Sequence, residues 1–390
     1  MDQKVAKKLF EEGAFLVLLD VPEKVEFGID YNCWNVGPLF KGVKMIPPGL
    51  HFVFYSAVSR EGQTAPRTGF FHFFQRQEVF VKKWSPFAEE LTSNDVTDEM
   101  VERIRLNVKD LDRSLAPYPY ESLKKWASLT NYISKDVLER TQPTCGVISS
   151  VTEVESEEFH MKDRHAVQMK DESENADTPS VSIPGGMFAG VGQFPSIERE
   201  PAKPSTDLPE LKYKAQSVLR LSEVPKQKYP AGATPHQITQ CNLDRSYALT
   251  SMLHALNNDE KEFLGELQMS FVCFLIGHVF DAFEHWKELV RLLCSCEDAL
   301  VSHKDLYGNF ITVLHFQLKE IPQEFFVDIV SKTNFLTITL QSFFSNLEGS
   351  SSVDKALLKK GLQFKENVTK TFKWDFDVEP EDFAPTIVDI

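Results

Sequence analysis

Short apolar and aromatic runs, separated by glycine and proline, dominate the first 85 residues. Between Glu26 and Ser56, four glycines and three prolines interrupt such runs, which is typical of closely spaced strands and fixed turns. Similar runs occupy residues 14–20, 69–75 and 78–84, and we expect the last two to pair as a hairpin because only two residues separate them. Five or six short strands are therefore expected here, and a β-sandwich-like domain would bury them.

Helical periodicity begins at Thr97, a predicted N-cap with two acidic residues in the first turn. Apolar residues follow it at spacings of three and four: Met100, Ile104, Val108, Leu111 and Leu115. A second helical face covers residues 123–133. Because the loop between them is short, we expect an αα-hairpin that packs on the sheet and covers one face of the phenylalanine-rich run at residues 70–74.

The predicted fold class is α+β with two domains. A β-sandwich-like N-terminal domain with a helical hairpin is expected over residues 1–142, and an all-α helical domain over residues 207–373. Within the second domain, Thr234 to Gln237 form a capping-box start signal, and Pro322 is expected to open a later helix. Residues 143–206 lack periodicity and are predicted to be an acidic flexible linker, and residues 374–390 an acidic tail.

The net charge of −15 is concentrated in two segments. Residues 151–210 hold thirteen acidic and five basic residues, a net charge of −8, and residues 374–390 hold six acidic and no basic residues, a net charge of −6. The remaining chain is nearly neutral and carries no basic stripe of the kind that a phosphate backbone requires. We therefore expect a protein partner and no direct contact with nucleic acid.

The same sequence argues against a membrane protein or a secreted one. The longest nearly apolar run covers residues 269–280, whereas a bilayer span needs about 20 such residues. The N-terminus places Glu11 and Glu12 before its short apolar run and has no cleavage site of small residues, so a signal peptide is not expected. The six cysteines are scattered, which favours reduced thiols and a location in the cytoplasm and nucleus.

Motifs that would support catalysis or metal binding are weak. His278, Asp281 and His285 share a helical face, but the glutamate between two histidines that a zinc protease helix needs is missing, and the Cys294, Cys296 and His303 set is weaker still. The glycine-rich residues 185–192 are not followed by a helix, so they do not predict a phosphate site. Asp30, His51 and His72 are interpreted as isolated turn or edge residues. We assign no catalytic residue, no metal and no cofactor.

The acidic tail ends in a segment that favours a strand. Thr386, Val388 and Ile390 would lie on one face of this strand and Ile387 on the other, so the segment could extend an exposed sheet edge of a partner. The alternative is that the tail packs on its own domain through Trp374, Phe376 and Phe383. The candidate partner-binding residues are Phe383, Thr386, Ile387, Val388 and Ile390.

Several longer stretches carry a resemblance to a known family. They are FGIDYNCWNVGP and GVKMIPPGLHF near the N-terminus, PYPYESLKKWASLTNYIS, FVCFLIGHVFDAFEHWK and IPQEFFVDIVS further along, and WDFDVEPEDFAP in the tail. Together they resemble the A1-cistron splicing factor family, assembly factors of the U5 small nuclear ribonucleoprotein of the spliceosome. The resemblance covers nearly all of the chain and is thinner between residues 151 and 203.

The resemblance implies a specific function. Members of the family are understood to bind the large scaffold protein of the U5 particle, through its RNase H-like and adjoining C-terminal domains, and to delay loading of the helicase. It implies a non-enzymatic chaperone of particle assembly. We also expect a monomer that is located in cytoplasm and nucleus. Two other classes remain open from the residues alone. A helical adaptor in membrane trafficking would bind lipid or cargo tails, and an enzyme would need a concave site with convergent titratable groups.

Overall fold

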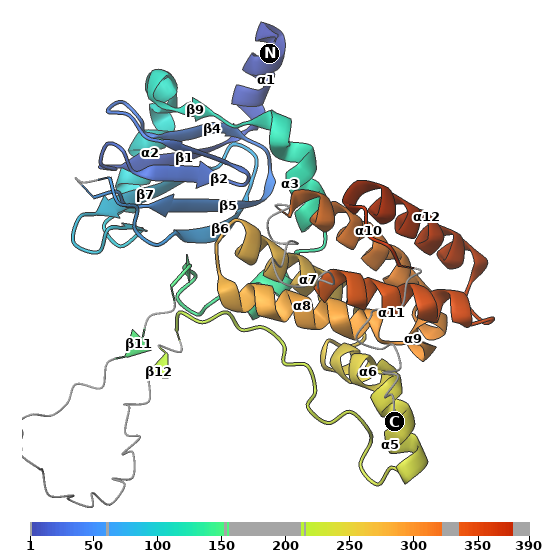
Figure 1. The fold of residues 1–390 in the computed structure, drawn as a ribbon. Coiled ribbons are helices and arrows are strands. Elements are labelled where there is room, and N and C mark those ends of the chain that lie inside the picture. Colours follow the sequence, from blue (N-terminus) through green and yellow to red (C-terminus); the bar gives the residue numbers. More distant parts are fainter. Residues whose placement is uncertain are drawn as a thin grey trace, which may run out of the picture. The chain divides into compact units, whose positions relative to one another are not determined.

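The structure, a computed structural model, describes residues 2–59, 62–151, 154–155, 212–213, 216–321 and 335–376 (Figure 1). The chain forms two compact units. The first comprises Met1–Thr152 and Ala215–Ile390, and the second Glu153–Lys214. In the second unit the described residues form one antiparallel strand pair, β11 (Val154–Glu155) with β12 (Lys212–Tyr213).

The first unit has the predicted α+β class. Its N-terminal part, residues 2–151, contains two sheets, and its C-terminal part, residues 216–376, is helical. The first sheet, within the described residues, has the strand order β8 (Glu90–Thr92), β7 (Val79–Ser85), β1 (Ala14–Leu19), β4 (Gly42–Ile46), β9 (Ala116–Pro117). The second has the order β10 (Ile148–Ser149), β6 (Thr68–Phe74), β5 (Gly49–Ser56), β2 (Glu26–Ile29), β3 (Asn32–Asn35).

The hairpin expected from residues 69–75 and 78–84 is wrong. Strand β6 pairs antiparallel with β5, whereas β7 pairs parallel with β1 in the other sheet. The two strands therefore face each other across the core: the His72 ring stacks on Phe80 with centroids 3.9 Å apart, and Phe70 and Phe74 also contact Phe80. This short turn carries the chain from one layer of the sandwich to the other.

The helix pair that follows the sheets also differs from the prediction. Thr97 caps α2 (Asp98–Leu106) as expected, but the long helix breaks into α2 and a 3₁₀ segment, η1 (Val108–Ser114). Both pack beside β1 and β7. After η2 (Tyr120–Ser122), helices α3 (Leu123–Thr130) and α4 (Lys135–Thr141) join the core of the helical part, so no αα-hairpin forms on one sheet.

Helices α3 and α4 cover the outer face of the second sheet. Phe52, Phe54 and Phe71 belong to the same buried cluster as Trp126 of α3, whose Nε1 donates a hydrogen bond to the Leu50 carbonyl oxygen at 2.6 Å. The expectation that the stretch after Pro117 covers part of the phenylalanine run is confirmed for Phe71. The N-terminal helix α1 (Gln3–Glu12) precedes β1.

The C-terminal part consists of helices packed around α7, in which every residue from Phe263 to Phe274 is buried. Its described helices are α5 (Pro235–Leu243), α6 (Ser246–Ala255), α7 (Glu260–Leu275), α8 (Phe280–Cys294), α9 (Asp298–Ser302), α10 (Lys304–Glu320), α11 (Phe335–Gly349) and α12 (Lys355–Phe372). The capping box at Thr234 is confirmed. The helix expected after Pro322 lies outside the described residues. None of the described helices is long and apolar enough to cross a membrane.

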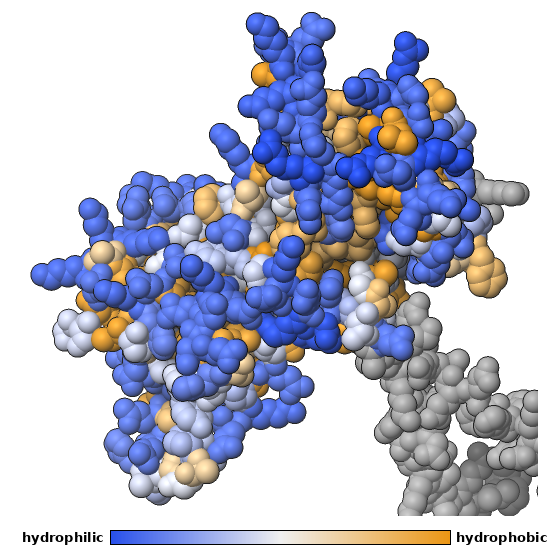
Figure 2. Space-filling view, turned by 180° about the vertical axis from the view of Figure 1, so that it is seen from behind, coloured by the Kyte–Doolittle hydropathy of each residue, from blue (hydrophilic) through white to orange (hydrophobic). Residues whose placement is uncertain are grey.

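Exposed apolar side chains are spread over several elements. The most exposed large ones include Leu39, Phe87, Leu106, Leu243 and Phe280. On the face drawn in Figure 2, hydrophobic residues show in separate areas among hydrophilic ones. The buried apolar residues form three clusters, and their burial stabilises the first unit.

Candidate functional site

The five predicted tail residues lie outside the described part of the chain, and their role stays a prediction. These residues are Phe383, Thr386, Ile387, Val388 and Ile390. The start of the tail is described, and it packs on the helical part. The Phe376 ring lies 5.0 Å from that of Phe344, and the Trp374 ring 4.7 Å from that of Phe372. The alternative that the tail packs on its own domain is thus confirmed for Trp374 and Phe376.

The two histidines of the weak metal motif, His278 and His285, contact different partners. His278, in a left-handed conformation after α7, has its Nε2 at 3.2 Å from Arg67 Nη1, which also donates to the Ile276 carbonyl oxygen. His285, on α8, instead faces Glu266. Among the residues that the structure describes, no three His, Cys, Asp or Glu side chains are placed to share a metal ion.

The neighbouring cysteines are buried thiols. Burial raises the pKa of Cys294 well above its ordinary value and that of Cys296 to about 12. Cys296 Sγ donates to the Leu292 carbonyl oxygen at 3.1 Å, and His303 Nδ1 lies 2.8 Å from Glu260. A protonated thiol is a poor nucleophile, and these two thiols are buried in the core of the helical part.

Asp30 and His51, interpreted from the sequence as isolated turn or edge residues, form one buried network, which corrects that interpretation. Asp30 Oδ2 lies 2.7 Å from His51 Nδ1 and accepts a hydrogen bond from the Tyr118 hydroxyl at 2.6 Å. Its other oxygen accepts from the Phe52 amide at 2.9 Å. His51 Nε2 lies 2.8 Å from the Pro47 carbonyl oxygen, so both ring nitrogens face acceptors. His51 lies on β5, an inner strand, and not at an edge.

Every polar atom of this network is occupied within the core. Asp30, His51 and Tyr118 are all buried. Burial, followed by the charge of Asp30, raises the pKa of Tyr118 well above its ordinary range, which keeps the hydroxyl protonated as a donor. The Asp30 carboxylate contacts three donors, and both ring nitrogens of His51 face acceptors within the protein, so these polar groups bind one another in the core. The network fixes the turn at Asp30, β5 and the loop of Tyr118 to one another.

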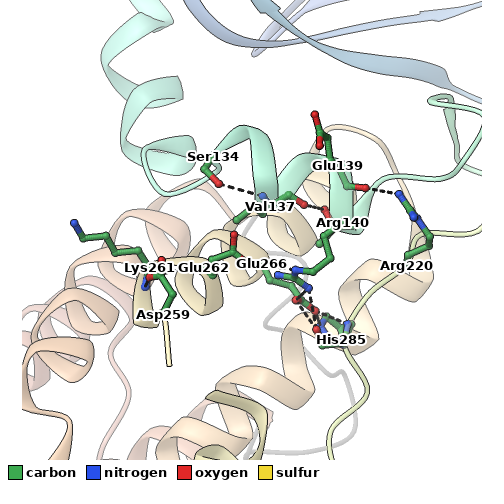
Figure 3. Close-up of polar contacts among 12 residues, drawn as sticks. Ser134, Val137, Glu139, Arg140, Arg220, Asp259, Lys261, Glu262, Glu266 and His285 are labelled. Carbon is green, nitrogen blue, oxygen red and sulfur yellow. Dashed lines mark hydrogen bonds and ion pairs between the residues drawn. The ribbon is translucent and has the colours of Figure 1, made fainter. Parts of the chain in front are cut away.

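The second buried network joins the N-terminal part to the helical part and is the candidate site (Figure 3). Glu266 of α7 is 1% exposed, and hydrogen-bond donors from three other segments contact its carboxylate. Arg140 Nη1, from α4, lies 2.5 Å from Glu266 Oε2, and His285 Nε2, from α8, lies 3.0 Å from Oε1. The Ser222 amide and hydroxyl donate to the two oxygens at 2.6 and 2.8 Å.

The electrostatics of Glu266 follow from these donors. Burial alone would raise the pKa of its carboxyl group, but the hydrogen bonds from His285 and Ser222 and the charge of Arg140 outweigh burial. Together they lower this pKa from 4.5 to about 2. The carboxylate is therefore ionised at neutral pH and held by charge-assisted hydrogen bonds. Because all its lone pairs are used, it positions segments and is not placed to act as an acid or base.

The chain that returns from the second unit is fixed at the same place. Arg220 donates from its side chain to the carbonyl oxygens of Gln142 and Glu139, and its amide donates to the Thr141 carbonyl oxygen at 2.8 Å. These contacts satisfy the free carbonyl groups at the C-terminus of α4. The segment at residues 216–222 thus closes one end of the α4 helix beside the Glu266 network, as Figure 3 shows for Arg220.

Helix α7 also contacts the turn between α3 and α4 directly. Gln268 accepts from the Tyr132 amide at 2.8 Å and donates to Asn131 Oδ1 at 2.8 Å. A Cβ atom at Gly265 would come within 2.4 Å of the Tyr132 carbonyl oxygen, so only glycine allows this close approach. Buried polar groups and a close backbone contact together fix α4 on α7, and with it the two parts of the first unit.

Sequence reasoning missed this junction, although α7 carried a signal. Glu266, Gln268 and Ser270 interrupt a run that is otherwise apolar, and all three are buried. A charged residue on a buried helical face needs a partner. The partner, Arg140, lies 126 positions away, so its identity required the tertiary structure.

Two family models match the chain. The model described as AAR2 N-terminal domain matches residues 12–143, and the model described as AAR2 C-terminal repeat region matches residues 221–377. The Glu266 network joins residues of both matched regions, with Arg140 in the first and Ser222, Glu266 and His285 in the second.

Relatives extend the likeness to the whole chain. The human protein named Protein AAR2 homolog is 45% identical over 395 residues, covering 100% of this chain and 97% of the relative. The relative of the same name from Caenorhabditis elegans is 38% identical over 376 residues, 96% of this chain and 98% of its own. The A1 cistron-splicing factor AAR2 of Saccharomyces cerevisiae is 22% identical over 83% of this chain and 81% of its own. The resemblance stated from the sequence motifs is confirmed, and the chain belongs to the AAR2 family of splicing factors.

Proposed function

We propose that this splicing factor is a non-enzymatic assembly factor of the U5 small nuclear ribonucleoprotein. It binds the large U5 scaffold protein through the RNase H-like and adjoining C-terminal domains of that scaffold, and it delays loading of the helicase. It acts as a monomer in cytoplasm and nucleus. The observation that carries the proposal is the match to AAR2 relatives over the full chain, together with the family motifs in the sequence.

Charge supports a protein as the direct partner. The two acidic segments hold −14 of the net charge of −15, so the remainder is close to neutral. A surface without excess positive charge does not attract a phosphate backbone. The Glu266 junction adds a second supporting feature, because it fixes the N-terminal and helical parts as one body that can present a continuous surface to a folded domain.

The tail supplies the most specific contact in the proposal. Residues 386–390 alternate in the manner of a strand, and a strand added to a sheet edge gains main-chain hydrogen bonds. Trp374 and Phe376 pack on the helical part, so a chain that ends at Phe376 removes the tail without opening the core. Phe376 is therefore the point at which to shorten the chain.

The test is co-elution in size-exclusion chromatography. The full chain and the chain ending at Phe376 are each mixed with a fragment of the U5 scaffold that contains its RNase H-like and adjoining C-terminal domains. We expect a complex with the full chain and weaker binding after truncation. Equal binding by both chains would move the contact to the folded parts, and absence of any complex would overturn the proposal.

A point variant sharpens the prediction for the tail. Val388→Pro removes a main-chain donor from the expected strand, and loss of one or two hydrogen bonds of about 1 kcal/mol each should weaken binding about tenfold. Val378→Pro, in the same tail but outside the expected strand, is the matched control and should leave the dissociation constant unchanged. Isothermal titration with the scaffold fragment measures both, and equal weakening would show that the strand is not the contact.

A further inference from the structure

A basic groove lies between α3 of the N-terminal part and α10 of the helical part. It has a volume of about 220 Å³ and is lined by Lys124, Lys125, Ser128, Phe316, Lys319 and Glu320, among others. The three lysines are exposed and come from both helices. The groove is thus a positively charged recess on a chain whose overall charge is −15.

The positive charge of the groove is only partly neutralised. Glu320 is the one carboxylate among its lining residues, and Lys125 Nζ lies 3.2 Å from it. Within the described part of the chain, the ammonium groups of Lys124 and Lys319 have no carboxylate within ion-pair distance; Lys319 instead lies 5.9 Å from the centre of the Phe316 ring. Two cations are therefore available to a ligand.

An exposed aromatic ring lines the same groove. Phe316 is 37% exposed, although the apolar side chains two positions before and after it along α10, Leu314 and Leu318, are buried. A ring flanked by ammonium groups suits a ligand segment that combines carboxylates with an apolar side chain. An acidic peptide with an aromatic residue has this chemistry.

We propose that this groove binds the acidic tail of the same chain. Residues 377–390 contain five carboxylate side chains, no basic residue and one aromatic residue, Phe383, which follows Glu381 and Asp382 directly. The tail therefore matches the groove in charge and in its single ring. In the free protein the tail lies in the groove, and if the proposed function holds, it must leave the groove before it extends a sheet of the scaffold.

The position of Phe376, the last described residue of the tail, supports the tail as the segment that binds in the groove. Phe376 contacts Phe344 at 5.0 Å, Phe344 contacts Phe364 at 6.0 Å, and Phe364 contacts His315 at 6.3 Å between ring centres. His315 precedes Phe316 on α10. An extended residue spans about 3.3 Å, so the fourteen residues 377–390 can span up to about 46 Å, well beyond the summed separations of these rings.

Carbodiimide cross-linking of the full chain tests the location of the tail. The reagent joins an ammonium group to a carboxylate in direct contact, and the Lys125–Glu320 pair serves as the internal positive control. In monomers isolated after reaction we expect links from Lys124 or Lys319 to Glu379, Glu381 or Asp382. Equal linking of the tail to Lys355 and Lys359, exposed lysines of α12, or links confined to covalent dimers, would overturn the proposal.

A charge-reversal variant gives an independent readout. Lys124→Glu/Lys319→Glu should release the tail, so that a glutamate-specific protease cleaves after Glu381 about fivefold faster, as expected for the loss of two exposed ion pairs and an apolar contact. Lys4→Glu/Lys8→Glu on α1 changes the charge equally and should cleave at the wild-type rate. Circular dichroism confirms that each variant is folded. An unchanged rate in the groove variant would exclude the tail from the groove, whether or not the scaffold binds the chain.

Discussion

Replacing Glu266 by alanine should lower the free energy of unfolding by about 3–5 kcal/mol, because it removes a buried carboxylate that holds four donors and leaves the half-buried Arg140 with only its contact to Glu262. The substitution removes the acceptor of Arg140, His285 and the Ser222 amide at once. The two parts of the first unit would then lose the interaction that fixes α4 on α7. Urea unfolding followed by circular dichroism measures the change, with the midpoint and slope fitted separately.

Glu262→Ala is the matched control for this prediction. Glu262 lies one turn earlier on α7 and also contacts Arg140, with Oε2 at 3.4 Å from Arg140 Nε, but its side chain is more exposed. An exposed pair contributes about 0–1 kcal/mol, so this variant should lose little stability. Similar losses in the two variants would mean that helix propensity or general charge on α7, and not the buried junction, determines the effect.

The lowered pKa of Glu266 adds a dependence on pH. A carboxyl group with a pKa of about 2 in the folded chain and 4.5 in the unfolded chain stabilises the fold fully above pH 4.5. This contribution is lost as the pH falls from 4.5 toward 2, and it amounts to about 3 kcal/mol. Glu266→Gln should therefore flatten the stability curve in this range, whereas Glu262→Gln should retain its slope. Parallel curves for the wild type and Glu266→Gln would disprove the assignment.

The junction shows what sequence patterns can and cannot locate. The sequence predicted an all-α domain over residues 207–373, but the need of the charged Glu266 within α7 for a polar partner was missed. Local spacing holds no information about which distant residue supplies the partner. Arg140 lies in the first matched region and Ser222 follows the acidic segment, so only the tertiary fold brings them together.

The strands illustrate the same limit. Alternation and turn residues placed β5, β6 and β7 correctly along the chain, because those signals depend on neighbouring residues. Which strands pair with each other depends instead on which side chains become buried against one another. Phe70 and Phe74 on β6 pack against Phe80 on β7, so the two strands face each other across the core and each pairs within its own sheet. A two-residue turn allows β6 and β7 either to form a hairpin or to enter different sheets. Burial of the three phenylalanine rings favours the second arrangement.

The second large effect is expected at Asp30. Asp30→Ala removes the acceptor of the Tyr118 hydroxyl and the Phe52 amide and the partner of His51, all within the core, and should cost about 3–5 kcal/mol of unfolding free energy. Asp30 also adopts a φ of 53°, which aspartate tolerates better than alanine does. Thermal and urea unfolding of the full chain measure the loss.

Two further variants separate charge from hydrogen bonding at this site. Asp30→Asn keeps the volume and the backbone conformation, and a neutral His51 can still donate from Nε2 to the Pro47 carbonyl oxygen while Nδ1 accepts from the new amide. We therefore expect Asp30→Asn to cost less than Asp30→Ala. Tyr118→Phe removes one of the three donors and should cost about 1–2 kcal/mol. If Asp30→Asn were as damaging as Asp30→Ala, the negative charge itself, and not the set of hydrogen bonds, would be what this core requires.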